Sequence, residues 1–378
     1  MDFTLTDEQQ AIRAAARKFA QAELAPRAAE FDEQESVPPS LYERLAEQGY
    51  FGMLVPEEYG GAAMDLMSYT LVLQEFARAS ASVMVGLAVH NTLACGALLA
   101  FGSREQKEKY LPRLVAGEFG AYSLTEPGSG SDAGSLRCRA VLEGDHYVVD
   151  GNKCFVTNAG LAKLVVLFVS TKPEAKNKGI SCLLVELPSA GATVGAKEKK
   201  MGIRGSDTRE LTFADCAVPA ANLLGKSEQG FAIALSLLEG GRIGIAAQSI
   251  GIAEAAFAEA VRYAQERKQF GQSIASFQAI QFKLAAMATR IEAARLLMYA
   301  AVVKKAAGGR VAQEASMAKW FASQTANFVA SEAVQIFGGY GYIRDSAVER
   351  YFRDARITEI YEGTSEVQQM VIAREILG

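Results

Sequence analysis

Hydrophobic residues recur at helical spacing through the first third of the chain. Thr6 and Gln9 have the spacing of a capping box, and an alanine-rich periodic sequence follows to about Ala29. A strongly apolar helical run extends from Met67 to Leu99. The pattern predicts an N-terminal helical domain over residues 1–118.

The period changes to that of strands from about Gly120. Strand-like runs follow at 139–142, 146–156, 163–171, 179–187 and 210–213. Asp150-Gly151 has the sequence of a type I′ hairpin turn. We expect a middle antiparallel β domain, a barrel or a sandwich, over residues 119–228.

Long helical patterns return after Gly230. Apolar residues recur at spacings of three and four from Phe277 to Ala301, which predicts packing in an antiparallel bundle. Comparable helices are expected at about 231–269, 311–337, 346–356 and 365–377. The third predicted domain is a C-terminal helical bundle over residues 229–378.

Length and composition narrow the class of protein. A chain of 378 residues is too long for one ordinary core, which agrees with a multidomain α+β fold. The net charge of −4 disfavours a nucleic-acid-binding protein. We find no apolar run near the roughly 20 residues that span a bilayer and no secretory or transit pattern at the start. These features predict a soluble, cytoplasmic protein without a membrane span.

Cysteine and histidine are too scattered to form a metal site. The five cysteines show no paired ligand spacing, and the only histidines, His90 and His146, are far apart in sequence. We therefore expect free buried thiols in a reducing compartment and no bound metal.

The stretch before the last helix carries the strongest candidate for chemistry. Ile357–Tyr361 is expected to be extended or a buried connector, and Ser365 with Gln368 reads as a capping box that opens the final helix. Glu362 lies between them, beside Gly363. Two interpretations remain open from these residues: a solvated glutamate ahead of a helix, or a carboxylate aimed at a ligand.

Two motifs resemble those of a known family. Tyr361-Glu-Gly-Thr-Ser365 resembles the catalytic signature of the acyl-CoA dehydrogenases, and Thr125-Glu-Pro-Gly-Ser-Gly-Ser-Asp132 resembles their flavin signature, about 230 residues earlier. The likeness is nearest to the short-chain, butyryl-type branch. It implies an N-terminal helical domain, a middle antiparallel β domain and a C-terminal four-helix bundle.

The resemblance implies FAD-dependent α,β-dehydrogenation of an acyl-CoA to the trans-2-enoyl-CoA. Glu362 would remove the α-proton, with its pKa raised by burial, and the flavin would accept the β-hydride. The thioester oxygen would receive hydrogen bonds from the Glu362 N–H and a ribityl hydroxyl. Some relatives carry the base immediately before the arginine that matches Arg242. That position is Gly241 here, which assigns the base to Glu362.

The same resemblance implies the residues that hold FAD. Phe155 stands where many relatives have tryptophan, so this sequence departs from the pattern at the ring-stacking position. The residues expected on the flavin are Tyr122, Leu124, Thr125, Gly130, Ser131, Phe155, Val156 and Thr157, with Thr364 and Glu366 completing its envelope. A neighbouring subunit would supply Arg267, Gln269, Phe270 and Gln278 at the pyrophosphate, and Gln335, Ile336, Gly338 and Gly339 at the adenine.

The implied substrate contacts come from several segments. Residues 81–101 would line the far end of the acyl pocket, and they contain no lysine or arginine, which disfavours a dicarboxylyl substrate. Small residues there (Ala94, Gly96, Ala97) could widen the pocket, so chain length stays open. The CoA and acyl contacts implied are Ser131, Glu239, Arg242, Tyr361, Gly363 and Arg374.

We therefore predict a short-chain acyl-CoA dehydrogenase that passes electrons to electron-transferring flavoprotein as a homotetramer. A medium-chain or 2-methyl-branched substrate is the alternative within the family. An acyl-CoA oxidase is less favoured, because such oxidases usually carry an additional C-terminal helical region. A non-catalytic scaffold that binds acyl-CoA belongs to a different class, and the retained Glu362 and flavin motif weigh against it.

Overall fold

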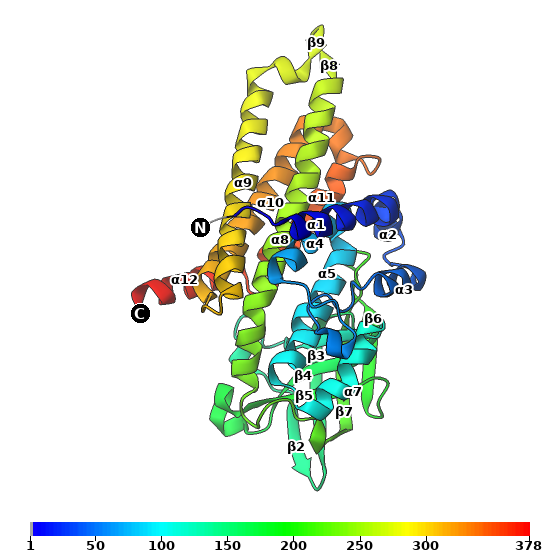
Figure 1. Cartoon of the computed structure of the whole chain (residues 1–378), viewed down its shortest axis with the longest axis vertical. Coiled ribbons are helices and arrows are strands. Elements are labelled where there is room, and N and C mark those ends of the chain that lie inside the picture. The colour runs from blue at the N-terminus through cyan, green and yellow to red at the C-terminus, as the bar shows by residue number, and fades with distance from the viewer. Residues whose placement is uncertain (1–2) are drawn as a thin grey trace.

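The computed structural model describes residues 3–378, and its first part is helical as expected (Figure 1). The Thr6 hydroxyl accepts from the Gln9 N–H at 3.2 Å, and the Gln9 side chain accepts from the Thr6 N–H at 3.1 Å. The predicted capping box is therefore confirmed. The helices of this part are α1 (Asp7–Phe19), α2 (Ala28–Glu33), α3 (Pro39–Glu47), α4 (Leu66–Ala79), α5 (Ala81–Ala88), α6 (Gly96–Phe101) and α7 (Arg104–Val115).

The apolar run from Met67 to Leu99 is divided rather than continuous. Ser80 is extended between α4 and α5, and a π-helical segment, Val89–Cys95, joins α5 to α6. Residues Ala81–Phe101 and Gly230–Glu266 are nevertheless long and apolar enough to span a membrane, so our estimate of the longest apolar run was wrong. In their most apolar windows 78% and 61% of the residues are buried in the protein, as in core helices.

The middle part is a β domain of seven paired strands. The sheet order is β1-β4-β2-β3-β7-β6, with β5 paired to β4. The β1–β4 and β2–β4 pairings are parallel, so the sheet is mixed rather than purely antiparallel as predicted. The strands are β1 (Phe119–Ser123), β2 (Arg139–Glu143), β3 (His146–Thr157), β4 (Ala162–Ser170), β5 (Ile180–Glu186), β6 (Ala192–Lys197) and β7 (Thr208–Pro219).

The predicted hairpin at Asp150-Gly151 is wrong. Strand β3 runs through both residues, and the turn between β2 and β3 lies at Gly144 and Asp145. Gly151 is instead at an irregularity in the β3–β7 register, with φ +142°. A Cβ atom there would lie 2.6 Å from the Cys138 Cα, so the glycine permits close approach of β2.

The third part consists of long helices. The predicted seam is confirmed, because Met287, Ile291, Ala294, Met298 and Ala301 are all buried. A short hairpin of β8 (Lys268–Gln269) and β9 (Gln272–Ser273) closes the end of this part that lies away from the β domain (Figure 1). The helices are α8 (Gly230–Glu266), α9 (Gln278–Ala306), α10 (Ala312–Phe337), α11 (Ala347–Arg356) and α12 (Ser365–Leu377).

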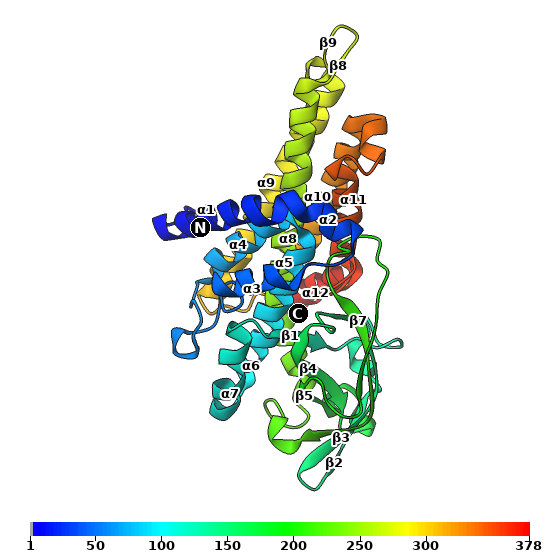
Figure 2. The same cartoon turned by 90° about the vertical axis from the view of Figure 1, so that its right-hand side faces the viewer.

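Helix α8 connects all three parts of the molecule (Figure 2). Its beginning lies against the β domain, and its middle packs against α4 and α10. A Cβ atom on Gly251 would lie 2.5 Å from the Gln74 carbonyl oxygen, so this glycine lets α8 and α4 approach closely. The site described below lies where α8, the β domain and the segment before α12 meet.

The prediction of free buried thiols is confirmed within the described residues. All five cysteines are buried and free. Residues 3–378 contain no group of three or more histidine, cysteine or acidic side chains placed to hold a metal ion.

Candidate active site

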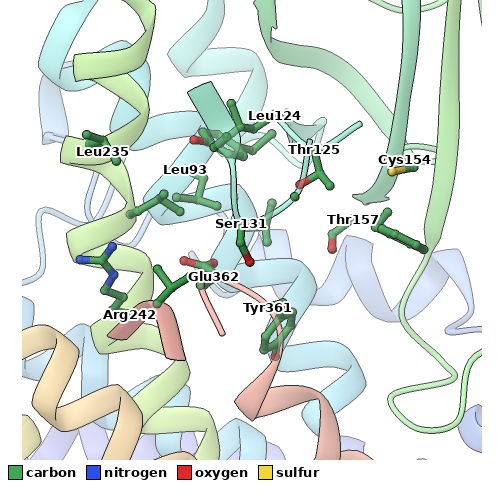
Figure 3. Close-up of a pocket in the computed structure, with 18 residues that line it drawn as sticks. Leu93, Leu124, Thr125, Ser131, Cys154, Thr157, Leu235, Arg242, Tyr361 and Glu362 are labelled. Atoms are coloured by element: carbon green, nitrogen blue, oxygen red, sulfur yellow. The ribbon is translucent and has the colours of Figure 1, made fainter. Parts of the chain in front are cut away.

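A cavity of about 210 Å³ lies between the β domain, α8 and the segment before α12 (Figure 3). It brings together residues from sequence positions 89 to 367. The predicted residues that line it are Tyr122, Leu124, Thr125, Gly130, Ser131, Phe155, Thr157, Arg242, Tyr361, Glu362 and Gly363. Both sequence motifs therefore contribute to one site.

Glu362 points into this cavity, between Arg242 and Ser131 (Figure 3). Its backbone has φ +54° and is followed by Gly363 at φ +93°, so the chain turns sharply there. The Glu362 Oε2 atom is buried and has no hydrogen-bond partner within residues 3–378. A buried carboxylate oxygen without a partner is suited to receive a proton from a ligand.

The surroundings of Glu362 change its proton affinity. Burial raises the pKa of this carboxyl group to about 7, while the positive charges of Arg242 and Lys319 oppose the rise. A carboxylate with this pKa is available as a base near neutral pH and can also return the proton.

Gly241 leaves the space that the Glu362 carboxylate occupies. A Cβ atom at position 241 would lie 1.7 Å from Glu362 Oε2. Any side chain at this position would therefore displace the carboxylate. Gly241 stands where some members of the family carry the base. Its lack of a side chain is what allows the Glu362 carboxylate to occupy this space.

The segment around Glu362 differs from two expectations. Ile357–Glu359 forms a helical turn in which the Ile357 carbonyl accepts from the Ile360 and Tyr361 N–H groups, so the extended alternative was wrong and the segment is a connector with Thr358 buried. The N-cap of α12 is Thr364, which accepts from the Val367 N–H at 3.3 Å, so the capping box at Ser365 was wrong. The Gln368 side chain instead donates to the Glu362 and Gly363 carbonyls.

Two segments of the β domain form the wall that the resemblance assigns to the flavin. The Cys154 N–H donates to the Thr125 carbonyl at 2.9 Å, which holds these segments together. Phe155 has φ +56° and is 67% exposed, and Thr157 also lines the cavity. Val156 is 2% exposed and its side chain packs in the β-domain core, which leaves its backbone for the contact with the flavin that the resemblance implies. Alternation along β3 explains this, since neighbouring side chains face opposite sides of a strand.

This wall fits a flavin ring. Phe155 presents an aromatic face, and the hydroxyls of Thr125 and Thr157 line the same cavity. The buried Tyr122 hydroxyl has no partner within the described chain. A Cβ atom on Gly130 would meet nothing within 4 Å, which leaves room beside its backbone.

The residues expected to serve a neighbouring subunit lie at the other end of the molecule. Arg267, Gln269, Phe270, Gln278 and Gln335 are exposed near the β8–β9 hairpin, and none of them lines the cavity. The Arg267 guanidinium lies 5.6 Å from the centre of the Tyr340 ring, next to Gly338 and Gly339. Ile336 is 6% exposed and belongs to the helical core, which leaves only its backbone for a contact of this kind.

Several other predicted residues also lie outside the cavity lining. Thr364 caps α12, Glu366 is exposed, and Arg374 is exposed beside Glu375. Glu239 pairs with Lys305 at 3.7 Å. Ala94 and Ala97 are fully buried and do not line the cavity, so they do not widen it as suggested. Ala94 packs on Gly120, where a Cβ atom would lie 2.4 Å away.

Some residues of the site were not recognised in the sequence. Val89 and Leu93 come from the segment 81–101 that was expected to line the acyl pocket. The apolar lining residues that were not expected are Ala133, Cys154, Leu235, Leu238 and Val367. Their apolar spacing is the same as that of core residues, so the sequence carries no signal for them. Lys319 and Gln368 were missed because buried polar residues within helices resemble surface residues in sequence.

Family models describe each part of the chain. Models for the acyl-CoA dehydrogenase N-terminal, middle and C-terminal domains match residues 6–118, 121–216 and 228–377. Together they cover both motifs and all the residues that line the cavity.

Relatives of similar length point to related chemistry. The short-chain specific acyl-CoA dehydrogenase of Clostridium acetobutylicum is 47% identical, with 100% of each chain covered. The acryloyl-CoA reductase (NADH) of Anaerotignum propionicum is 47% identical, covering 100% of this chain and 96% of the relative. The solved structure of butyryl-CoA dehydrogenase from Megasphaera elsdenii has a TM-score of 0.98 at 45% identity, with 100% of both chains covered. The chain therefore belongs to the acyl-CoA dehydrogenase family of FAD-dependent oxidoreductases.

Proposed function

We propose that this acyl-CoA dehydrogenase acts on short, uncharged acyl chains and passes electrons to electron-transferring flavoprotein. The observation that carries the proposal is the unpartnered Glu362 carboxylate, which faces the wall of Thr125, Phe155 and Thr157 across one cavity. A thioester between these surfaces would have its α-carbon at the base and its β-carbon at the flavin.

The residues of this chain would divide the work of the reaction. Glu362 takes the α-proton, and the apolar side chains around it exclude water and keep its pKa near neutral. The Glu362 N–H donates no hydrogen bond within residues 3–378, so it is free to bind the thioester oxygen. Bound FAD supplies the acceptor for the β-hydride.

The lining of the cavity supports a short, neutral acyl group. Val89, Leu93 and Leu235 provide large apolar side chains. Within the described chain, Arg242 and Glu362 are the only charged residues that line the cavity. A distal carboxylate on the substrate would find no further cation there, and would stay unpaired in an apolar environment.

Flavin reduction by defined thioesters tests this function. Purified protein with bound FAD is mixed anaerobically with butyryl-, octanoyl- and 2-methylbutyryl-CoA, and the flavin absorbance is followed. We expect butyryl-CoA to bleach the flavin fastest. Faster bleaching by octanoyl- or 2-methylbutyryl-CoA would assign the alternative chain length or branching, and no bleaching by any thioester would reject dehydrogenation.

Reduction of a 2-enoyl thioester is a second candidate direction. The carboxyl group of Glu362, with a pKa near 7, can donate a proton as well as accept one. The similarity to an acryloyl-CoA reductase favours testing it. Reoxidation of the reduced flavin by crotonyl-CoA is compared with reoxidation by electron-transferring flavoprotein and by oxygen. Fastest reoxidation by oxygen would indicate an oxidase.

We further propose a homotetramer in the cytoplasm. Large apolar or aromatic residues are exposed away from the cavity, including Phe270 at 93%, Tyr342 at 87% and Leu377 at 84%. Surfaces of this kind are commonly covered by other chains. Light scattering of the FAD-bound protein tests the tetramer, and a monomer that retains FAD would contradict it.

A further inference from the structure

Two buried polar side chains hold the segment that carries Glu362 without lining the cavity. Lys319, in the first third of α10, donates from Nζ to the Gly363 carbonyl at 2.7 Å. Gln368, in the first turn of α12, donates from Nε2 to the Glu362 and Gly363 carbonyls at 3.1 and 2.9 Å. Both side chains are 0% exposed.

These bonds act on an unusual backbone. Glu362 and Gly363 have successive positive φ values of +54° and +93°. A glutamate in the left-handed region is strained, so the surrounding structure has to hold it there. Lys319 and Gln368 donate hydrogen bonds to the carbonyl groups of these two residues. Because the bonds hold this backbone in place, they orient the Glu362 side chain and its N–H.

The charge of Lys319 has a second effect. Five titratable side chains interact electrostatically with Glu362. They are Arg242 on α8, Lys319 on α10, Tyr69 on α4, Tyr122 on β1, and Tyr361, which precedes Glu362 in the chain. Burial raises the pKa of all three tyrosines, so they remain uncharged near neutral pH. Two cations therefore act on one carboxylate.

Lys319 keeps its charge where Glu362 titrates. Burial lowers the pKa of Lys319 to about 8, while Glu362, Glu359 and Glu366 raise it and Arg242 lowers it. The ammonium is thus still largely protonated near pH 7. Within the described chain, Lys319 forms no ion pair, and its ammonium group donates a hydrogen bond to the Gly363 carbonyl.

We propose that Lys319 is a positioning residue for the dehydrogenation: it orients the Glu362 loop through the Gly363 carbonyl, and its buried ammonium group acts on the Glu362 carboxylate through its charge. Gln368 shares the orienting role and contributes no charge. The assignment rests on the proposed function only in naming the reaction that Lys319 serves.

Three variants separate the two roles of Lys319. Lys319→Met removes the charge and the hydrogen bond, whereas Lys319→Gln removes the charge and keeps an N–H donor. Gln368→Leu removes two hydrogen bonds without removing a charge. Loss of an opposite charge close to a carboxyl group raises its pKa by about one pH unit. We expect both Lys319 variants to raise the pH at which Glu362 titrates, and Gln368→Leu to leave it unchanged.

The titration is measured directly and does not require turnover. The infrared band of a protonated carboxyl group is followed against pH in the FAD-bound protein, and Glu362→Gln identifies the band by its loss. Anaerobic flavin bleaching by butyryl-CoA is measured over the same pH range. We expect the acid limb of the rate to move up by about one pH unit in both Lys319 variants. Gln368→Leu should lower the rate about tenfold at every pH, since misplaced reacting groups slow catalysis.

The outcomes distinguish this inference from the proposed function. If the Glu362 infrared band titrates at the same pH in Lys319→Gln as in the wild type, the electrostatic role is overturned. This variant also provides the test if Lys319→Met does not fold. A wild-type rate in Gln368→Leu and in Lys319→Met would overturn the orienting role. If no thioester bleaches wild-type flavin, the proposed function fails, while the infrared titration still decides whether Lys319 controls Glu362.

Discussion

The two ends of the C-terminal helical part differ in whether their candidate functional residues are enclosed by this chain or exposed. At the end beside the β domain, Glu362, Arg242 and Lys319 are enclosed by one chain, and burial has shifted the pKa of each. At the β8–β9 end, Arg267 and Phe270 are exposed, and neither lines the cavity around Glu362. The residues for proton transfer therefore come from one chain, whereas the residues at the β8–β9 end are proposed to act in a neighbouring chain.

The largest effect is expected from Glu362→Gln, which removes the base and nearly preserves its shape. General base catalysis contributes about 10²–10⁴-fold, so flavin bleaching by butyryl-CoA should slow by about this factor. FAD retention should be unchanged, because the proposed phosphate contacts lie at the other end. Stopped-flow absorbance measures the rate, and Glu375→Gln on helix α12, which follows the Glu362 segment, is the matched carboxylate control. Bleaching at the wild-type rate would remove Glu362 as the base.

Gly241→Ala tests whether space at the first end is a functional requirement. The new Cβ atom would lie 1.7 Å from Glu362 Oε2, so the carboxylate has to move. Displacement of a reacting group by about 1 Å can cost about 10²-fold in rate. The adjacent Gly240→Ala is the control, because its Cβ atom would meet nothing within 4 Å. Equal rates in the two variants would contradict the steric role of Gly241.

Arg267→Ala tests the second end. If this guanidinium binds the FAD pyrophosphate of a neighbouring chain, its removal should weaken FAD retention by about tenfold or more, since charge-assisted hydrogen bonds contribute about 1.5–3 kcal/mol. Acyl-CoA binding to the FAD-loaded protein should change less. Equilibrium dialysis of FAD gives the retention, and the neighbouring exposed Lys268→Ala is the control. A larger loss of thioester binding than of FAD would exclude Arg267 from the cofactor site.

The difference between the ends also explains what could be predicted from the sequence. The motifs around Thr125 and Glu362 are local, so their resemblance located both walls of the cavity before its geometry was known. The Lys319 side chain, by contrast, reaches the Gly363 carbonyl from α10, 44 residues earlier in the sequence. No local sequence pattern indicates a contact between residues so far apart. The Asp150-Gly151 hairpin failed because a favourable turn sequence was overridden by pairing of β3 with both β2 and β7.

The smallest predicted effect concerns stability. The pKa of Glu362 is about 7 in the folded protein and near 4.5 when exposed, so the unfolded state loses this proton first as pH rises. Its favourable contribution is complete below about pH 4.5 and is lost by pH 7. Compared with low pH, the ionised carboxylate then lowers the stability of the fold by about 3 kcal/mol, from about 1.4 kcal/mol for each pH unit between the two values. Glu362→Gln should therefore unfold at a higher temperature than wild type at pH 8, by a few degrees, and the advantage should vanish at pH 4.5.

Glu332→Gln, at the second end, removes a carboxylate that is paired with Lys283 and should give no such gain. Thermal unfolding of the FAD-bound proteins at both pH values measures the difference, and an equal gain in Glu332→Gln would show that the cost is not specific to the base.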